Sequence, residues 1–293
     1  MFVWLCVVLR IVANPCSNVF QKILTRKHAH PLFIVGTTHA LLTIVCLPAL
    51  IVKPPPLSLA FWSDMAICTL LTVSGNALLV QAVKLADLSV LGPINAWKSV
   101  VSLVPGMFLL GEIPAPLAIA GIALVVAGNY GLSDARPDEP RHRALWRLLG
   151  DRGVQCRFAA LVLSATEAVF FKRALVHSSA VTAFALWAAF GFPVSLAAAW
   201  VRIGREGLAR EGRLWRAHWT TYLLLFLTTG LMQFSTAVTL ESLPVGSALA
   251  LFQISTVLSV ILGHRLFQEG HFLKRLAGSL LMAAGAVLII ISR

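Results

Sequence analysis

The segment AGIALVVAG at residues 120–128 recurs 157 positions later, as AGSLLMAAG at residues 277–285. Small residues at this spacing share one face of a helix and let two helix backbones approach closely, which favours helix packing where lipid is the solvent. Glu112 recurs as Glu269 at the same offset. Similarity at one fixed offset indicates two copies of one unit, each ending in a small-residue packing helix.

The rest of each copy matches at slightly shorter offsets. At an offset of 155 the pairs are Gly75 with Gly230, Ala82 with Ala237 and Trp97-Lys98 with Phe252-Gln253, and at 150 they are Val19-Phe20 and Lys22 with Val169-Phe170 and Lys172. Each copy holds five apolar runs. Because five is odd, the second copy must enter a membrane from the opposite side, so the sequence predicts an inverted repeat.

The composition excludes a water-soluble protein. Of the 293 residues, 58% are hydrophobic and 12% are charged, and the mean hydropathy is +0.84, whereas soluble domains carry about 25% charged residues. A transmembrane helix needs about 20 apolar residues. Ten such runs occur, at residues 2–20, 31–52, 59–81, 88–110, 115–131, 157–176, 179–202, 218–239, 245–264 and 273–291. We therefore expect an all-α integral membrane protein with ten transmembrane helices as two inverted five-helix repeats.

The one long polar segment predicts the domain organisation. We expect a first repeat over residues 1–131, a basic polar linker over residues 132–156 and a second repeat over residues 157–293. Eighteen Lys and Arg fall on the linker side of the predicted spans and four on the other side. Because cytoplasmic loops are enriched in Lys and Arg, this count predicts a cytoplasmic linker, outside termini and, in a bacterium, a multi-pass protein of the cytoplasmic membrane. Lipid headgroups account for the basic charge, so we expect no nucleic-acid partner.

Several kinds of chemistry lack the residues that would support them. The five cysteines, Cys6, Cys16, Cys46, Cys68 and Cys156, have no metal-ligand or paired spacing, so we expect free thiols, no disulfide and no metal. The sequence contains no zinc-protease HExxH, no nucleophile-elbow GxSxG, no P-loop and no pair of intramembrane aspartates. We therefore predict no catalytic residues, no cofactor and no enzyme activity.

Polar side chains inside the apolar spans mark the predicted substrate site, because an ionisable residue near the bilayer centre costs at least ~2.5 kcal/mol unless it faces protein or water. Lys98 and Gln253 occupy repeat-equivalent positions near mid-span, where inverted-repeat carriers bind their substrates. Asn95, Lys98 and Ser102 share one helical face, Gln253 and Thr256 are their counterparts, and Trp97 and Phe252 could form apolar walls. In the alternative interpretation, Lys98 hydrogen-bonds carbonyls freed at Pro93 and Pro105.

The first span of each copy also carries a polar face. Arg10, Asn14, Ser17 and Gln21 follow one another at helical spacing, and Ser164 and Glu167 match Asn14 and Ser17 at the offset of 150. Two interpretations of Glu167 stay open: it pairs with Arg10 or Lys98, or it couples transport to protons, a role for which His39 is a weaker candidate.

These charges predict a slightly cationic interior. Arg10 and Lys98 stand against Glu167, which favours a substrate with an anionic group that Arg10 could hold in a bidentate manner. Asn76, Gln233 and Gln253 would add hydrogen bonds.

The sequence resembles the drug/metabolite transporter superfamily of the EamA type. The resemblance rests on LGPINAWKSVVSLVPGMFLLGEIP at residues 91–114, on the two small-residue segments quoted above and on NVFQKIL at residues 18–24. It implies a central cavity lined by spans 1 to 4 and 6 to 9, with spans 5 and 10 as supports. Members are usually drawn with both ends cytoplasmic, opposite to the charge count, so both orientations stay open.

We therefore expect a secondary transporter that moves a small metabolite, with an anionic group, by alternating access through a cavity between the repeats. A flippase for a lipid-linked sugar or lipid headgroup is the alternative, and an intramembrane enzyme acting on a lipid is the alternative from another class. The expected partners are the substrate and the membrane lipids, and we expect a monomer.

Overall fold

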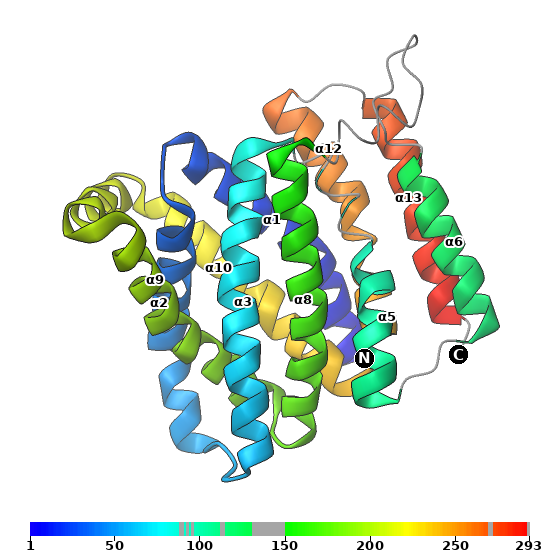
Figure 1. Ribbon diagram of the computed structural model, residues 1–293, viewed down its shortest axis with the longest axis horizontal. Helices are drawn as coiled ribbons and strands as arrows, with labels where there is room; N and C mark the ends of the chain where they lie inside the picture. The colour runs from blue at the N-terminus through cyan, green and yellow to red at the C-terminus, as the bar shows by residue number, and fades with distance from the viewer. Residues whose placement is uncertain are drawn as a thin grey trace.

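The computed structural model describes residues 1–87, 91, 94, 97–111, 115–130, 150–268 and 272–291. These residues form helices joined by short turns, and no β-strand occurs among them (Figure 1). The helices of the first half are α1 (Phe2–Arg26), α2 (Pro31–Val52), α3 (Leu59–Leu85), α5 (Trp97–Leu110) and α6 (Pro116–Tyr130). Those of the second half are α8 (Arg152–Val176), α9 (Ala180–Ala217), α10 (Trp219–Ser242), α11 (Val245–Phe252), α12 (Ser255–Phe267) and α13 (Phe272–Ile291).

The prediction of an all-helical membrane protein is confirmed. Six helices of the described chain, α1, α2, α3, α8, α9 and α10, are long and apolar enough to cross a membrane. Each of them overlaps one of the predicted apolar runs, but α9 continues to Ala217, well past the run predicted to end at residue 202. The remaining helices, α5, α6, α11, α12 and α13, lie within or close to the other four predicted spans. Residues 131–149, which make up most of the predicted linker, lie outside the described residues, as do Glu112 and Glu269.

Local capping explains where the helices begin. The Asp151 carboxylate accepts a hydrogen bond from the Val154 backbone N–H at 2.9 Å, and the Ser179 hydroxyl accepts one from that of Thr182 at 3.2 Å. Such N-caps satisfy backbone donors that the first helical turn leaves free. The cap at Asp151 starts α8 at Arg152, five residues before the span predicted from residue 157.

The predicted continuous span over residues 245–264 is wrong in one respect, because the helix breaks at Gln253 and Ile254 into α11 and α12. The Gln253 side-chain Nε2 donates to the Leu249 carbonyl, four residues earlier, at 2.8 Å. A continuing helix would use its backbone N–H for that carbonyl. The side chain thus supplies an alternative donor at the break, as an interrupted helix in lipid requires.

The helices pack in pairs that join the two halves. The most extensive contacts are α3 with α8, α1 with α10, α2 with α9 and α6 with α13. In order along the two halves, α1 corresponds to α8, α2 to α9, α3 to α10 and α6 to α13. Exchanging each helix for its counterpart turns the pair of α3 and α8 into the pair of α10 and α1. The pair of α2 and α9 and the pair of α6 and α13 stay the same. The two repeats are therefore related by a pseudo-two-fold arrangement.

Figure 1 also shows the direction of the helices. The helix α1 starts at the N label, near the place where α13 finishes at the C label, whereas α8 starts at the opposite end of the bundle. The end that holds the last turns of α1 and α3 and the start of α8 is called the linker end below, and the other the terminus end. At the linker end α8 approaches the end of α3 closely at Gly153, where an added Cβ atom would lie 2.7 Å from Ala86 Cβ and 3.1 Å from Leu85 Cβ.

Candidate functional site

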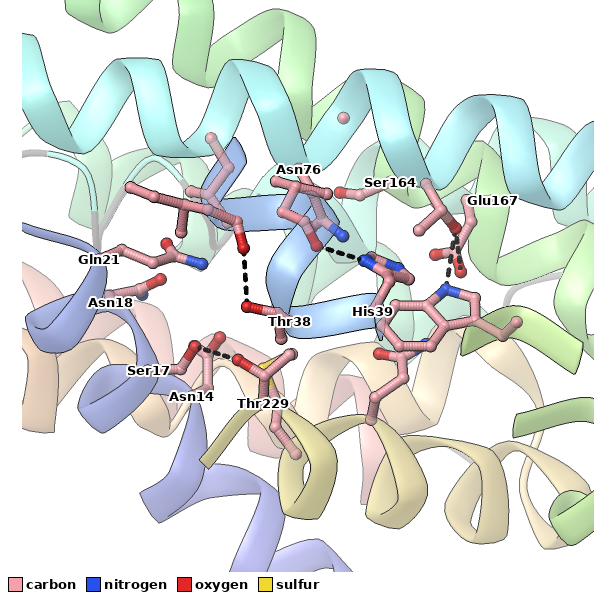
Figure 2. Close-up of a pocket in the computed structure, with 18 of the residues that line it drawn as sticks. Asn14, Ser17, Asn18, Gln21, Thr38, His39, Asn76, Ser164, Glu167 and Thr229 are labelled. Atoms are coloured by element: carbon pink, nitrogen blue, oxygen red, sulfur yellow. Dashed lines mark hydrogen bonds between the residues drawn. The ribbon is translucent and has the colours of Figure 1, made fainter. Parts of the chain in front are cut away.

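A polar cavity lies between the two repeats (Figure 2). Its volume is about 90 Å³, enough for several water molecules at about 10–15 Å³ each. The helices α1, α2, α3, α8, α9 and α10 line it, together with Lys98 of α5. The walls are thus drawn from both halves of the chain.

One wall is the polar face of α1. Asn14, Ser17, Asn18 and Gln21 line the cavity from successive turns, and Figure 2 shows them on one side of it. The Ser17 and Thr229 hydroxyl oxygens are 2.9 Å apart, and Asn14 Nδ2 donates to the Ser255 hydroxyl at 3.3 Å. These bonds connect the first helix of one repeat to helices of the other.

Three cations line the cavity, namely Arg10, Lys98 and Arg157. Arg10 Nε donates to the Thr236 hydroxyl at 2.7 Å, and its guanidinium carbon lies 4.8 Å from the Phe252 ring centroid. Arg10 Nη1 is buried and has no hydrogen-bond partner among the described residues. Arg157 Nε donates to the Leu91 carbonyl at 3.2 Å.

Glu167 of α8 is the carboxylate of this cavity. Its Oε1 accepts hydrogen bonds from the Thr72 hydroxyl at 3.2 Å and from the Cys68 thiol at 3.6 Å. Trp187 Nε1 donates to the same Thr72 hydroxyl at 3.0 Å, so the hydroxyl must point its proton towards Glu167. Lys98 and Arg10 attract the carboxylate electrostatically. With three cations and one carboxylate, the described lining residues carry a formal excess of two positive charges when His39 is neutral.

His39 lies beside this network. Its Nδ1 is 2.9 Å from the Val35 carbonyl, which can only accept, so Nδ1 carries the proton of the neutral ring. The ring packs 4.4 Å from that of Trp187, and its Nε2 is buried without a partner among the described residues. It also fits against Gly191, where a Cβ atom would come within 2.1 Å of it. His39 is therefore held by close packing between α2 and α9.

The predicted site residues divide into two groups. Those that line the cavity are Arg10, Asn14, Asn76, Lys98, Gln233, Glu167 and His39. Those that do not line it are Trp97, Ser102, Phe252, Gln253 and Thr256. Gln253 is bonded to its own helix, Phe252 lies under Arg10, and Thr256 donates to the Gln253 carbonyl at 2.7 Å. Asn95 lies outside the described residues.

The sequence prediction did not include Arg157, Thr72 or Trp187. Arg157 was counted with the linker charges, yet it continues the face of Ser164 and Glu167 at helical spacing, seven and ten residues before them. That spacing could have identified it. Nothing in the local sequence distinguishes Thr72 and Trp187 from ordinary residues of an apolar span, since their role arises from contacts between α3, α8 and α9.

The two ends of the cavity differ in how the apolar side chains around them are grouped. At the terminus end, one continuous cluster joins both repeats and reaches the cavity at Trp187. At the linker end there are two separate clusters. Ile34 belongs to one of them and Leu79 packs against the other, and both residues line the cavity. Among the described residues, the apolar packing around the cavity is thus continuous at the terminus end and divided at the linker end.

The described residues contain no group of three or more His, Cys, Asp or Glu side chains that could hold a metal ion. The cavity offers cationic and amide donors, together with hydroxyls. Such a lining suits recognition of a small polar molecule.

The EamA-like transporter family matches residues 5–133 and 151–291 of this sequence. The chain belongs to the EamA-like transporter family. The two matched segments correspond to the two repeats, and the family consists of membrane transporters of the drug/metabolite type. This EamA-like protein is accordingly a multi-pass membrane protein, as its apolar helices indicate.

Comparison with solved structures supports the fold of the EamA-like chain. One solved structure, described only as the crystal structure of a protein, superposes on this chain with a TM-score of 0.65 at 15% sequence identity. The match covers 99% of this chain and 96% of the other chain. At that identity the likeness concerns the fold alone. No curated protein matches the sequence.

Proposed function

We propose that this EamA-like protein is a secondary carrier that moves a small metabolite with an anionic group by alternating access. The observation that carries the proposal is the polar cavity between the repeats, in which Arg10, Lys98 and Arg157 stand against the single carboxylate Glu167. An anionic group would offset this excess of positive charge. Arginine can clasp a carboxylate or phosphate through two hydrogen bonds, and Arg10 Nη1 is a free donor for this purpose among the described residues.

Alternating access requires a pathway that opens to one side at a time. The single apolar cluster at the terminus end and the two separate clusters at the linker end support access from the linker end in this conformation. We propose that the two repeats rock about the cavity, and that the terminus-end cluster separates in the opposite state. No P-loop occurs in the sequence, so an ion gradient or the substrate gradient supplies the free energy.

The proposed membrane arrangement has ten crossings, with residues 1–131 and 157–293 as inverted repeats and residues 132–156 as the connecting linker. The opposite directions of α1 and α8 support it. The helix ends that carry most cations, including Arg26, Lys84 and Arg265, belong to the linker side of this arrangement. By the positive-inside tendency we place the linker end in the cytoplasm.

The nature of the cavity favours a soluble solute over the lipid-linked substrate of a flippase. A flippase needs an apolar path along which acyl chains stay in lipid while the headgroup crosses. Most residues that line this cavity are polar or charged, and its volume is about 90 Å³. We therefore assign the cavity to a small solute, and a lipid substrate becomes an outcome of the transport assay.

A ligand screen on the purified protein tests this function. Amino acids, short carboxylates and sugar phosphates are each compared with an uncharged analogue by thermal shift, because a ligand that binds the native state raises its stability. We expect stabilisation by an anionic compound and its uptake into proteoliposomes. Lys98→Ala should weaken binding about tenfold or more, since a hydrogen bond to a charged group contributes about 1.5–3 kcal/mol.

The matched control is Lys84→Ala, which removes an exposed lysine at the linker end. It should leave binding and uptake unchanged. Equal stabilisation by charged and uncharged analogues, or equal effects of the two lysine variants, would contradict an anion site at Lys98. Uptake of a lipid-linked headgroup but of no soluble compound would replace the carrier with the flippase.

A further inference from the structure

A second feature of the molecule lies outside the central cavity, at the linker end of α9. Gly204 adopts φ 64° and ψ −176°, which ends the membrane-crossing part of the helix. Residues 205–217 continue as a separate helical segment, termed the α9 extension. Glu211 of this segment is 1% exposed, and its Oε2 accepts a hydrogen bond from the His30 backbone N–H at 3.1 Å. The extension is thus fixed to the start of α2.

The extension is amphipathic. Leu208, Leu214 and Trp215 pack against the apolar cluster formed by α1, α2 and α10 at the linker end. Arg210, Arg213 and Arg216 repeat every three residues and are exposed. A helix with these two faces at the edge of a transmembrane bundle lies in the interface between lipid and water.

An apolar groove begins where the extension meets α10. It is lined by Leu41, Trp215, Arg216, Trp219, Tyr222 and Leu223 and has a volume of about 360 Å³. Trp219 is 56% exposed and Leu223 39% exposed, so the groove opens on the outer surface of the bundle. It shares no residue with the central cavity.

Tyr222 and Trp215 line this groove, and each has a buried donor atom, the Tyr222 hydroxyl and Trp215 Nε1, without a partner among the described residues. Tyr222 is only 2% exposed. An unpaired polar group in such a place is destabilising unless an acceptor reaches it. Because the groove faces the membrane interface, a ligand that enters it from lipid can bring acceptor oxygens to these donors.

The rim of the groove is cationic. Arg216 lines it, and Arg213 stands one helical turn before Arg216. Neither arginine forms an ion pair with a described residue. Guanidinium groups bind phosphate through paired hydrogen bonds, and basic residues beside a membrane attract anionic lipids.

We propose that this groove binds an anionic phospholipid from the leaflet at the linker end. The phosphate lies at Arg216, and the phosphate or glycerol-ester oxygens accept hydrogen bonds from Trp215 and Tyr222. One acyl chain follows Leu41 and Leu223 along the outer surface of α2 and α10. The proposal depends on the membrane location of the protein and is independent of the substrate of the central cavity.

Native mass spectrometry of the purified full-length protein tests the site. The protein is titrated with phosphatidylglycerol and, separately, with phosphatidylcholine that has the same acyl chains. We expect at least tenfold tighter binding of phosphatidylglycerol. Arg216→Ala should reduce that preference severalfold. The control is Arg205→Ala, which removes an exposed arginine of the same extension that does not line the groove, and it should retain the preference.

Tyr222→Phe provides a second variant that keeps the shape of the groove. It removes only a hydroxyl that has no partner among the described residues, so the protein should fold normally while binding phosphatidylglycerol severalfold more weakly. Equal affinity of the native protein for the two lipids would overturn the proposal. The same conclusion would follow if Arg216→Ala had no larger effect than Arg205→Ala, or if Tyr222→Phe bound the lipid as tightly as the native protein.

Discussion

Glu167 illustrates how single residues adapt to burial in this protein. A charge removed from water needs opposite charges and hydrogen-bond donors around it. Glu167 has both, since Thr72 and Cys68 donate to Oε1 while Lys98 and Arg10 provide positive charge. Trp187 of another helix donates to the Thr72 hydroxyl and so helps to orient it. The carboxylate is therefore positioned by three helices, α3, α8 and α9.

Glu167→Gln tests whether this carboxylate acts as a counter-ion. The substitution keeps the shape of the side chain and removes the negative charge, so the formal excess of positive charge in the cavity rises from two to three. We expect an anionic ligand to bind about tenfold more tightly and to be released more slowly, which lowers the maximal uptake rate. Binding is measured by thermal shift and uptake in proteoliposomes.

The same variant separates the two interpretations of Glu167. A carboxylate that serves as a counter-ion leaves the response of uptake to an imposed pH gradient intact, and this is the result we expect. Loss of the response in Glu167→Gln, with binding retained, would instead identify Glu167 as a proton-coupling group. His39→Gln is the companion variant, because His39 also lines the cavity and its imidazole can carry a proton.

At the scale of the helices, glycine lets α6 and α13 approach closely. A Cβ atom at Gly128 of α6 would lie 2.7 Å from Met282 Cγ and 2.8 Å from the Gly278 carbonyl oxygen of α13. Lipid provides no hydrophobic drive for helix association, so close backbone packing has to hold this pair together. The repeated AG pattern at the ends of the two halves thus has a direct physical role.

Gly128→Ala should therefore destabilise the pair of α6 and α13. The added methyl group collides with backbone as well as with a side chain, and overpacking of this kind costs about 1–3 kcal/mol. The matched control is Gly212→Ala in the α9 extension, where a Cβ atom meets nothing within 4 Å. There, alanine should be neutral or stabilise by about 0.5–1 kcal/mol.

Thermal unfolding of both variants in detergent measures the difference. A midpoint for Gly128→Ala at or above that of Gly212→Ala would show that the crossing of α6 and α13 tolerates separation. In that case the small-residue pattern would not hold these helices together.

At the scale of the whole molecule, the buried apolar residues that the structure describes are grouped differently at the two ends of the bundle. The apolar cluster at the terminus end includes residues from α1, α2, α3, α8, α9, α10 and α11, and it is continuous. At the linker end the apolar residues form two clusters with polar cavity residues between them. This grouping predicts the direction from which water reaches the cavity.

Cysteine accessibility tests that direction. In a protein whose five native cysteines are replaced, Asn18→Cys lines the cavity and should react with an impermeant maleimide added at the linker end. Val7 belongs to the terminus-end cluster and is only 3% exposed, so Val7→Cys should stay protected from reagent on either side. Lys84→Cys, which is exposed, marks the membrane face that the linker end occupies.

If Asn18→Cys reacted only with maleimide added at the terminus end, the access route assigned above would be contradicted. Labelling of Lys84→Cys from outside the cell would reverse the proposed orientation and agree with termini in the cytoplasm. The two results are independent, because the first concerns the conformation and the second the topology.

The local sequence predicted most of the helices of this protein. An apolar run of about 20 residues can satisfy its backbone only as a helix in lipid, and this condition depends on neighbours along the chain. The runs at 31–52 and 59–81 accordingly correspond to α2 and α3. The polar face of α1 was predictable for the same reason, since helical spacing alone places Asn14 and Gln21 on one side.

Contacts between distant segments decided the rest. Lys98 and Gln253 are equivalent in the repeat, yet Lys98 lines the cavity whereas Gln253 bonds to the Leu249 carbonyl where α11 ends. Thr72 and Trp187 became part of the Glu167 site only because α3, α8 and α9 pack together. Hydropathy specifies that a segment is helical, but the face that meets the cavity depends on which helices pack around it, and that is set by the tertiary structure.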